Sequence, residues 1–412
     1  MGNYSLVCRS CGERCEGDAY RCPSCGGILN TEYPFDRRDA LCSALRNARQ
    51  YWDYEPFFPI GRECEKVTMG EGFTPLVPAP GIARAFGIRQ MSIKNEGLNP
   101  TGTFKDRCMS ISISKAKALG ASAVVIGSAG NAGAAAAAYA ARAGIPCYVM
   151  VPTSTPPERV AQIQLYGARV ILVRGSVTDC IDLIARVYRE RGWHNVTTAS
   201  AYNPFQADSE KAIAYEMAKA SGWEVPDWLF VPIGGGGILS GIYRGYLDLF
   251  RLGLVKKLPR MVGTQEEGCC AVVNAFRAGR KPAQIERVEN PAGIAVAIAD
   301  AYPLDGETAL QAIYDSGGYS ESVSSAEILE AQRLLGRTEG IFAEAASSTT
   351  LAAAKKLREK GVVQAGDSVA CVVTGSGLKD LQLAARHMPR PAEVEIDPEQ
   401  LNRAVDGMEA AV

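Results

Sequence analysis

The chain has 412 residues, of which 47% are hydrophobic and 22% charged, and its formal net charge is −1. This length allows two or three domains with large cores, and the charge balance argues against nucleic acid or an anionic membrane as a partner. Thirteen cysteines, mostly scattered, indicate reduced thiols in a cytoplasmic protein, and the two histidines form no pattern typical of a catalytic triad or metal site.

The N-terminal segment, residues 1–30, contains two Cys-x2-Cys pairs separated by ten residues. Two such pairs can place four thiolates tetrahedrally around Zn²⁺, and the metal would fold a segment too short to form a core. We therefore predict a zinc-ribbon-like segment with a structural Zn²⁺ bound by Cys8, Cys11, Cys22 and Cys25. Cys15 is an additional thiol that leaves the ligand set open, and the alternative is a flexible tail of free thiols.

Short apolar strands alternate with helix-length segments after an aromatic arm at residues 31–70. The predicted strands are 91–95, 123–126, 147–151, 169–173, 228–233, 261–265 and 369–373, and the predicted helices begin at 104, 132, 156, 177 and 206. Such crossovers predict parallel sheets covered on both faces. The most apolar region, 121–151, is interrupted by polar residues, glycine and proline, so we expect no transmembrane helix.

Lys105 lies in the polar loop 99–107, which leads directly into a predicted helix. The positive end of the helix dipole and the neighbouring Arg107 both disfavour another positive charge, so we expect a neutral amine. A neutral lysine amine can form a Schiff base with an aldehyde cofactor such as pyridoxal phosphate. The alternative, for an isolated lysine, is a solvated residue at a helix start.

Two glycine-rich turns each follow a predicted strand. The first contains Ser128, Ala129, Gly130 and Asn131 and opens an alanine-rich helix, whose free backbone N–H groups can bind a substrate carboxylate. The second contains four consecutive glycines, Gly234, Gly235, Gly236 and Gly237, which allow the backbone to wrap closely around a phosphate at a helix start. Tight strand–helix packing is the alternative explanation for the first turn.

A third turn, residues 374–380, follows the last predicted strand and presents the hydroxyls of Thr374 and Ser376. A hydroxyl at the carboxyl end of a strand can bond a ring nitrogen of a cofactor, although a nucleotide-binding turn is an alternative. Together, a reactive lysine, a carboxylate site, a phosphate cradle and a pair of hydroxyls describe a pyridoxal phosphate site.

At these residues the chain resembles the fold type II pyridoxal phosphate enzymes, and among them the threonine synthases. The resemblance covers about residues 70–386. It includes the segments 71–76, 99–107, 128–131, 203–205, 223–228, 234–237, 339–342 and 374–380.

The resemblance implies an α/β fold with two parallel-sheet, three-layer domains of the tryptophan-synthase-β-like type. The implied large cofactor-binding domain comprises residues 31–97 and 206–388, the small domain 98–205, and a tail helix lies in 389–412. It also implies a homodimer, with an amino acid as the small-molecule substrate.

The resemblance also assigns roles to individual residues. Lys105 would form the internal aldimine with pyridoxal 5'-phosphate and shuttle protons. Asn131 would bond the ring oxygen of the cofactor while its loop holds the substrate carboxylate. Gly234 to Gly237 would hold the cofactor phosphate, and Thr374 would bond the pyridine nitrogen. The implied activity is conversion of O-phosphohomoserine and water to threonine and phosphate.

Four positions depart from the threonine synthase pattern. Gln206 stands where the family usually has an arginine that helps hold the substrate phosphate, and we expect Gln206 to contact the substrate. The cofactor loop is all glycine, as in serine and threonine dehydratases, Ser376 replaces a common histidine, and Ala129 replaces a threonine. The alternatives are therefore a β-eliminating dehydratase or ammonia-lyase, or a β-replacing synthase, acting on a serine-like or threonine-like amino acid. A non-catalytic relative, recruited through the zinc ribbon, is disfavoured by the intact Lys105.

Overall fold

The computed structural model describes residues 4–15, 19–61 and 63–409, and the chain forms two compact units, 1–379 and 380–412. The second unit contains α13 (Leu381–Arg386) and α14 (Pro398–Glu409). The predicted tail helix is thus present as α14, and residues 410–412 of the predicted segment lie outside the described part of the chain. Within the described residues, no helix is long and apolar enough to cross a membrane.

The larger sheet of the first unit has six strands in the order β12-β11-β10-β13-β5-β4. In chain order these are β4 (Leu76–Pro78), β5 (Gln90–Asn95), β10 (Trp228–Pro232), β11 (Arg260–Glu266), β12 (Tyr319–Val323) and β13 (Ser368–Val373). All neighbouring pairs are parallel except β4 and β5, which are antiparallel. The expectation of an all-parallel sheet is therefore corrected at one edge, where β4 reaches β5 through the short helix α2 (Pro80–Phe86).

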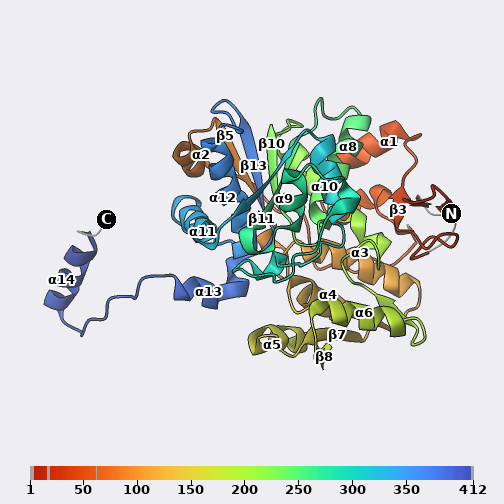
Figure 1. Cartoon of the computed structure of the whole chain (residues 1–412), viewed down its shortest axis with the longest axis horizontal. Helices are drawn as coiled ribbons and strands as arrows, with labels where there is room; N and C mark the ends of the chain where they lie inside the picture. The colour runs from red at the N-terminus through yellow and green to blue at the C-terminus, as the bar shows by residue number, and fades with distance from the viewer. Residues whose placement is uncertain (1–3, 16–18, 62, 410–412) are drawn as a thin grey trace. The chain divides into compact units, whose positions relative to one another are not determined.

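Helices cover both faces of this sheet (Figure 1). Two successive residues of β11 identify a helix on each face. A Cβ added to Gly263 would lie 2.9 Å from Cδ1 of Ile313 in α10 (Gly306–Asp315). The next residue, Thr264, bonds Thr349 of α12 (Ala345–Glu359) over 2.8 Å between their Oγ1 atoms. Because successive side chains of a strand point to opposite faces, α10 and α12 belong to opposite outer layers.

The smaller sheet has four parallel strands in the order β8-β7-β6-β9. Its strands are β6 (Ala123–Gly127), β7 (Cys147–Pro152), β8 (Arg169–Val173) and β9 (Trp193–Asn195). Val124 and Ile126 pack in a core with the alanine-rich α4 (Asn131–Ala143). Val125 packs in a separate core with α6 (Val177–Val187), so this sheet is also the middle of three layers.

The N-terminal segment forms its own antiparallel sheet of β1 (Ser5–Cys8), β2 (Arg14–Cys15) and β3 (Leu29–Glu32). Residues 16–18 of the predicted ribbon lie outside the described residues. Leu6 and Leu29 pack against Phe205, so an apolar contact attaches the segment to the rest of this unit.

The remaining helices connect the strands. They are α1 (Arg38–Asn47), α3 (Lys105–Ala118), α5 (Pro157–Leu165), α7 (Lys211–Ala220), α8 (Gly237–Arg251), α9 (Ala271–Arg277) and α11 (Ser325–Glu339). Short 3-10 helices lie at Tyr51–Phe57, Glu96–Leu98, Pro204–Asp208, Glu267–Cys269, Pro282–Gln284, Val296–Ile298 and Gly377–Asp380.

The helix predicted from residue 206 is divided in the structure. Pro204 to Asp208 form a 3-10 turn, and α7 begins only at Lys211. The other predicted helix starts lie within one residue of α3, α4, α5 and α6. Gly144 ends α4 in the left-handed conformation, with φ of 70°, as expected for a glycine at a helix C-terminus. The domain boundaries stay a prediction.

Candidate active site

The Lys105 loop and the third glycine-rich turn are joined by backbone hydrogen bonds. The N–H of Phe104 donates to the carbonyl of Thr374 over 3.0 Å, and the N–H of Ser376 donates to the carbonyl of Gly102 over 2.9 Å. Thr374 directly follows β13, at the carboxyl end of the large sheet. Ligands of open α/β sheets bind at this edge, so the two segments that carry the predicted lysine and hydroxyl meet where a site is expected.

Lys105 is the first residue of α3 and is half-buried. Its Nζ lies 3.2 Å from Oγ1 of Thr198 and 4.6 Å from the ring centroid of Phe104. Thr198 follows the short strand β9. The sequence analysis did not identify it, although two consecutive threonines directly after a strand could have indicated a site residue. The amine is therefore oriented by a hydroxyl from the smaller sheet.

Arg107 pairs with two buried carboxylates, and its expected influence on Lys105 stays a prediction. The Arg107 guanidinium is fully buried and donates to Glu96 over 2.7 Å from Nε, and to Glu216 over 2.6 Å from Nη1. Lys94 also bonds Glu216 over 2.6 Å. Although burial opposes ionisation, Arg107 holds the pKa of Glu96 at about 2. The two carboxylates neutralise the charge of Arg107, and the cluster anchors α3 to the elements that carry Glu96 and Glu216.

The predicted carboxylate-binding loop leads into α4 as expected. Ser128, Ala129 and Gly130 are partly exposed, and no side chain caps the start of α4, so its first N–H groups are available to a ligand. Asn131 directs its amide toward the large-sheet side, where Nδ2 donates to Glu344 Oε2 over 3.0 Å. The loop and the turn after β13 thus meet through Glu344.

Glu344 is a residue of this site that the sequence did not reveal. Its Oε1 accepts a hydrogen bond from Thr374 Oγ1 over 3.4 Å, and Ser347 Oγ lies 3.0 Å from the same hydroxyl. Burial raises the pKa of the Glu344 carboxyl, although hydrogen bonds from Asn131 and Thr374 and the charge of Lys379 act in the opposite direction. A weakly acidic carboxyl therefore lies between the two groups expected to bind the cofactor ring.

The four-glycine loop has no room for side chains at two of its positions. Gly236 has φ of 101°, and a Cβ there would lie 2.7 Å from the carbonyl oxygen of Asp305. A Cβ at Gly234 would lie 2.9 Å from Oδ2 of Asp300. No side chain caps α8, which begins at Gly237, so its first N–H groups are left for a ligand. This geometry fits a phosphate bound by backbone amides at a helix N-terminus.

In the described part of the chain, the Gln206 side chain forms no hydrogen bond with the other predicted site residues. It is 1% exposed, and its Nε2 has no hydrogen-bond partner among the described residues. No described hydrogen bond connects its side chain to Lys105, Asn131 or the glycine loop. An unpaired buried amide is costly, so this donor is available to a bound molecule, but its substrate role stays a prediction.

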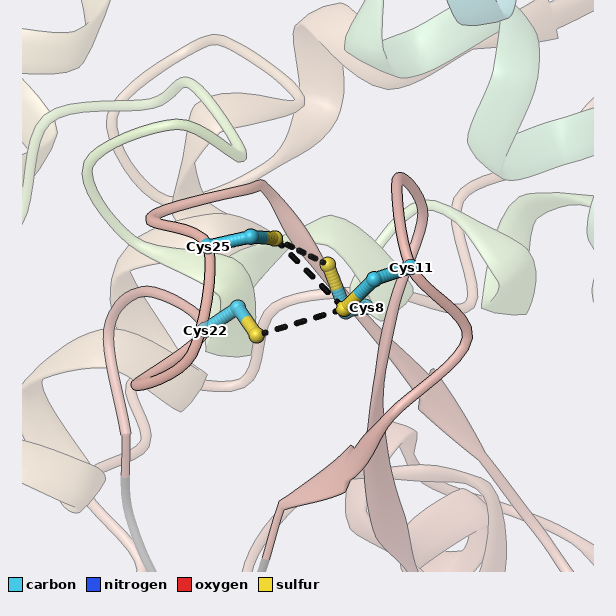
Figure 2. Close-up of side chains that lie close together, drawn as sticks. All are labelled: Cys8, Cys11, Cys22 and Cys25. Atoms are coloured by element: carbon cyan, nitrogen blue, oxygen red, sulfur yellow. Dashed lines mark hydrogen bonds between the residues drawn. The ribbon is translucent and has the colours of Figure 1, made fainter.

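The four predicted cysteine ligands converge in the N-terminal segment (Figure 2). Their Sγ atoms all lie within 4.8 Å of one another, with 3.4 Å between Cys8 and Cys25 and 3.7 Å between Cys11 and Cys22. Four sulfurs around one Zn²⁺ would be about 3.8 Å apart, so the cluster fits a tetrahedral metal. Cys15 contacts the carbonyl of Glu13 and stands outside the cluster.

Comparisons with known proteins agree with this geometry. The profile of the family described as pyridoxal-phosphate dependent enzyme matches residues 67–375. A threonine synthase of Methanocaldococcus jannaschii is 37% identical over 96% of this chain and 98% of its own length. A threonine synthase of Methanosarcina acetivorans is 36% identical over 98% of this chain and 99% of its own.

Solved structures share the fold at lower identity. Maize serine racemase is 21% identical, with a TM-score of 0.66 over 76% of this chain and 91% of its own. An L-serine ammonia-lyase of Rhizomucor miehei is 20% identical, with a TM-score of 0.65 over 78% of this chain and 99% of its own. At these identities the likeness extends to the architecture alone.

Proposed function

Because the chain belongs to the pyridoxal-phosphate-dependent enzyme family, as a threonine-synthase-like lyase of fold type II, we propose that it converts O-phosphohomoserine and water to threonine and phosphate. The observation that carries the proposal is the convergence of Lys105, Asn131 and Thr374 at the carboxyl edge of the sheets. The near-complete alignment with threonine synthases supports the choice among lyases.

Each residue of the site has a role in this proposal. The bound cofactor would supply an electron sink that stabilises negative charge next to the substrate nitrogen. Lys105 holds the cofactor and then moves protons at its Nζ, which Thr198 orients over 3.2 Å. The loop 128–131 binds the substrate carboxylate, Gly234 to Gly237 hold the cofactor phosphate, and Asn131 and Thr374 orient the ring.

We further propose that Cys8, Cys11, Cys22 and Cys25 bind a structural Zn²⁺. Their Sγ atoms lie within 4.8 Å of one another, and because a thiolate is the form of cysteine that binds metal, binding would release protons. A homodimer is proposed from the family resemblance. Thirteen cysteines without a disulfide favour a reducing compartment, so the cytoplasm is the proposed location.

The residue at position 206 favours a second class of function, β-elimination or β-replacement on a substrate without a phosphate. Gln206 has a neutral amide where threonine synthases usually have a phosphate-binding arginine, and the glycine loop offers no side-chain donor. A substrate without a distal phosphate, such as serine or threonine, needs neither. β-Elimination to a 2-oxo acid and ammonia, or β-replacement to a new amino acid, is the alternative.

One assay separates these possibilities. The cofactor-loaded protein is supplied with O-phosphohomoserine, and phosphate and threonine are measured together. Parallel reactions contain serine or threonine, with detection of 2-oxo acids. Equal amounts of phosphate and threonine support threonine synthase. Cofactor binding without phosphate release, combined with 2-oxo acid formation, would replace the proposal with the dehydratase alternative.

A further inference from the structure

A cavity of about 460 Å³ lies at the amino-terminal edge of the large sheet. Gln90 and Ser368, the first residues of β5 and β13, line it, and so does Pro226, which lies just before β10. Thr374 follows the other end of β13, which a strand of this length places about 20 Å from Ser368. Ligand cavities usually measure about 300–1,000 Å³. The cavity is therefore large enough for a small molecule and separate from the proposed active site.

Small side chains on one face of the sheet leave this space open. Ser92 of β5 is paired with Pro78 of β4 and with Ala370 of β13, and all three residues line the cavity. Paired residues of neighbouring strands point to the same face of a sheet, so these three form a continuous floor. Met217 and Ala220, three residues apart on one face of α7, line the cavity from the helix side. The cavity is thus a space between the sheet and α7.

The hydroxyl of Tyr246 indicates that this space has a polar occupant. Tyr246 lies in α8, lines the cavity and is fully buried. Its Oη has no hydrogen-bond partner among the described residues. Buried hydroxyls are nearly always bonded, because an unpaired one loses the hydrogen bonds that it would form with water. A molecule in the cavity with a donor or acceptor of its own would supply the missing partner.

The solvent-exposed residues of the cavity carry charges of both signs. Arg89 and Lys257 line it with side chains that are 58% and 49% exposed, and Glu224, also exposed, lines it as well. Both cations are paired with the single carboxylate of Asp227, over 3.5 Å and 2.5 Å, so one positive charge is in excess. The Glu224 carboxylate forms no hydrogen bond or ion pair with a described residue. An anion and a cation can therefore both be bound at the exposed end of the cavity.

We propose that this cavity binds a free α-amino acid whose side chain carries a hydrogen-bonding group. The ligand carboxylate pairs with Arg89 and Lys257, and its ammonium pairs with Glu224. Its side chain lies between the sheet and α7, where it bonds the hydroxyl of Tyr246. A ligand with a single charge would leave the opposite binding group unused. The inference goes beyond the proposed reaction and does not depend on it, because no residue that lines the cavity belongs to the predicted cofactor site.

The test is a binding measurement on the protein with pyridoxal 5'-phosphate bound and its linkage to the protein reduced, so that amino acids cannot react at Lys105. The probes are the standard amino acids, titrated singly in a calorimeter at concentrations up to about 10 mM. At least one amino acid with a polar side chain should bind. Its N-acetylated form lacks the ammonium and should bind about tenfold more weakly. Absence of binding by every amino acid overturns the inference and leaves the proposed reaction untouched.

Two variants locate the bound amino acid. Ser92→Ile fills the floor of the cavity with a side chain that suits a strand, so it should abolish binding. Glu224→Gln removes the partner of the ammonium and should weaken binding of the amino acid about tenfold, with no effect on its N-acetylated form. Glu190→Gln, at an exposed position outside the cavity, is the matched control and should bind as wild type does. Because Glu224 is exposed, its variant serves even if Ser92→Ile does not fold, and unchanged binding in either folded variant overturns the inference.

Discussion

Asn131 and Glu344 link the four-stranded and six-stranded sheet regions of the protein through a hydrogen bond of 3.0 Å from Nδ2 to Oε2. Asn131 begins α4 beside the smaller sheet, whereas Glu344 directly precedes α12 beside the larger one. Glu344 also accepts from Thr374. One carboxyl thus orients both side chains that are proposed to hold the cofactor ring.

Glu344→Gln is expected to lower kcat about tenfold while the cofactor stays bound, because Asn131 and Thr374 donate to different oxygens of Glu344 and the amide replaces one of these acceptors with an N–H2 donor. Steady-state kinetics with an absorbance check of cofactor content measures this. Glu330→Gln is the matched control, since Glu330 forms a surface ion pair with Lys355. Unchanged kcat in Glu344→Gln would show that the carboxyl does not orient the site.

Lys105→Ala should abolish covalent attachment of the cofactor and reduce the rate by at least about a thousandfold, because no described residue replaces its amine at the start of α3. The direct measurement is the mass of the protein after reduction of the loaded enzyme, which should increase in wild type only. A reduced, cofactor-labelled peptide containing another lysine would contradict the assignment.

Gly235→Ala tests the phosphate cradle without straining the backbone. A Cβ at Gly235 meets only Asp300, at 3.8 Å, so the methyl fits the protein and would intrude only on a bound phosphate. We expect about tenfold weaker pyridoxal 5'-phosphate binding with little change in stability. Gly336→Ala, at an exposed position of α11, is the matched control and should be neutral or slightly stabilising. Equal affinity in all three proteins would remove the glycine loop from the cofactor site.

The ribbon prediction concerns metal content. Wild type should contain one Zn²⁺ per chain, and Cys22→Ser should lose it together with several degrees in the melting temperature. Cys15→Ser is the matched control, since both thiols are buried but only Cys22 belongs to the cluster. Elemental analysis after dialysis measures the zinc content of each protein. Equal zinc in Cys22→Ser and Cys15→Ser would exclude the proposed ligand set.

Much of the fold was predictable because its strands are short apolar runs ended by glycine turns. The strand β12 was not predicted because its sequence is not apolar: it contains Glu321 and two serines, and all three side chains are buried. Arg277 and Lys360, which lie in other parts of the chain, form ion pairs with Glu321 and neutralise its charge. The sequence of the strand alone does not reveal these distant partners.

The site was predictable where one segment carries the chemistry, as at Lys105. Thr198 and Glu344 are distant in sequence from Lys105, and only the folded chain brings them to the site. The ion pairs of Arg107 with Glu96 and Glu216 were unpredictable for a related reason, because both carboxylates come from other segments of the chain.

The stability of the protein should depend on Asp106, the residue after Lys105. Burial raises the pKa of its carboxyl to about 7, although two hydrogen bonds from Thr101 oppose this. A carboxyl whose pKa is raised in the folded state stabilises the protein below its unfolded pKa, near 4, and loses that contribution as the pH rises through about 7. The free energy of unfolding should therefore fall between about pH 4 and about pH 7, by up to roughly 4 kcal/mol from this group.

Asp106→Asn should flatten that fall, which urea unfolding at successive pH values measures. Asp227→Asn is a control of opposite sign: although partial burial opposes this, the hydrogen bonds from Lys257 and Ser368 hold the pKa of Asp227 below its usual range, so its contribution is lost as the pH falls. If Asp106→Asn keeps the full wild-type slope, the buried carboxyl beside Lys105 is not what makes the fold sensitive to rising pH.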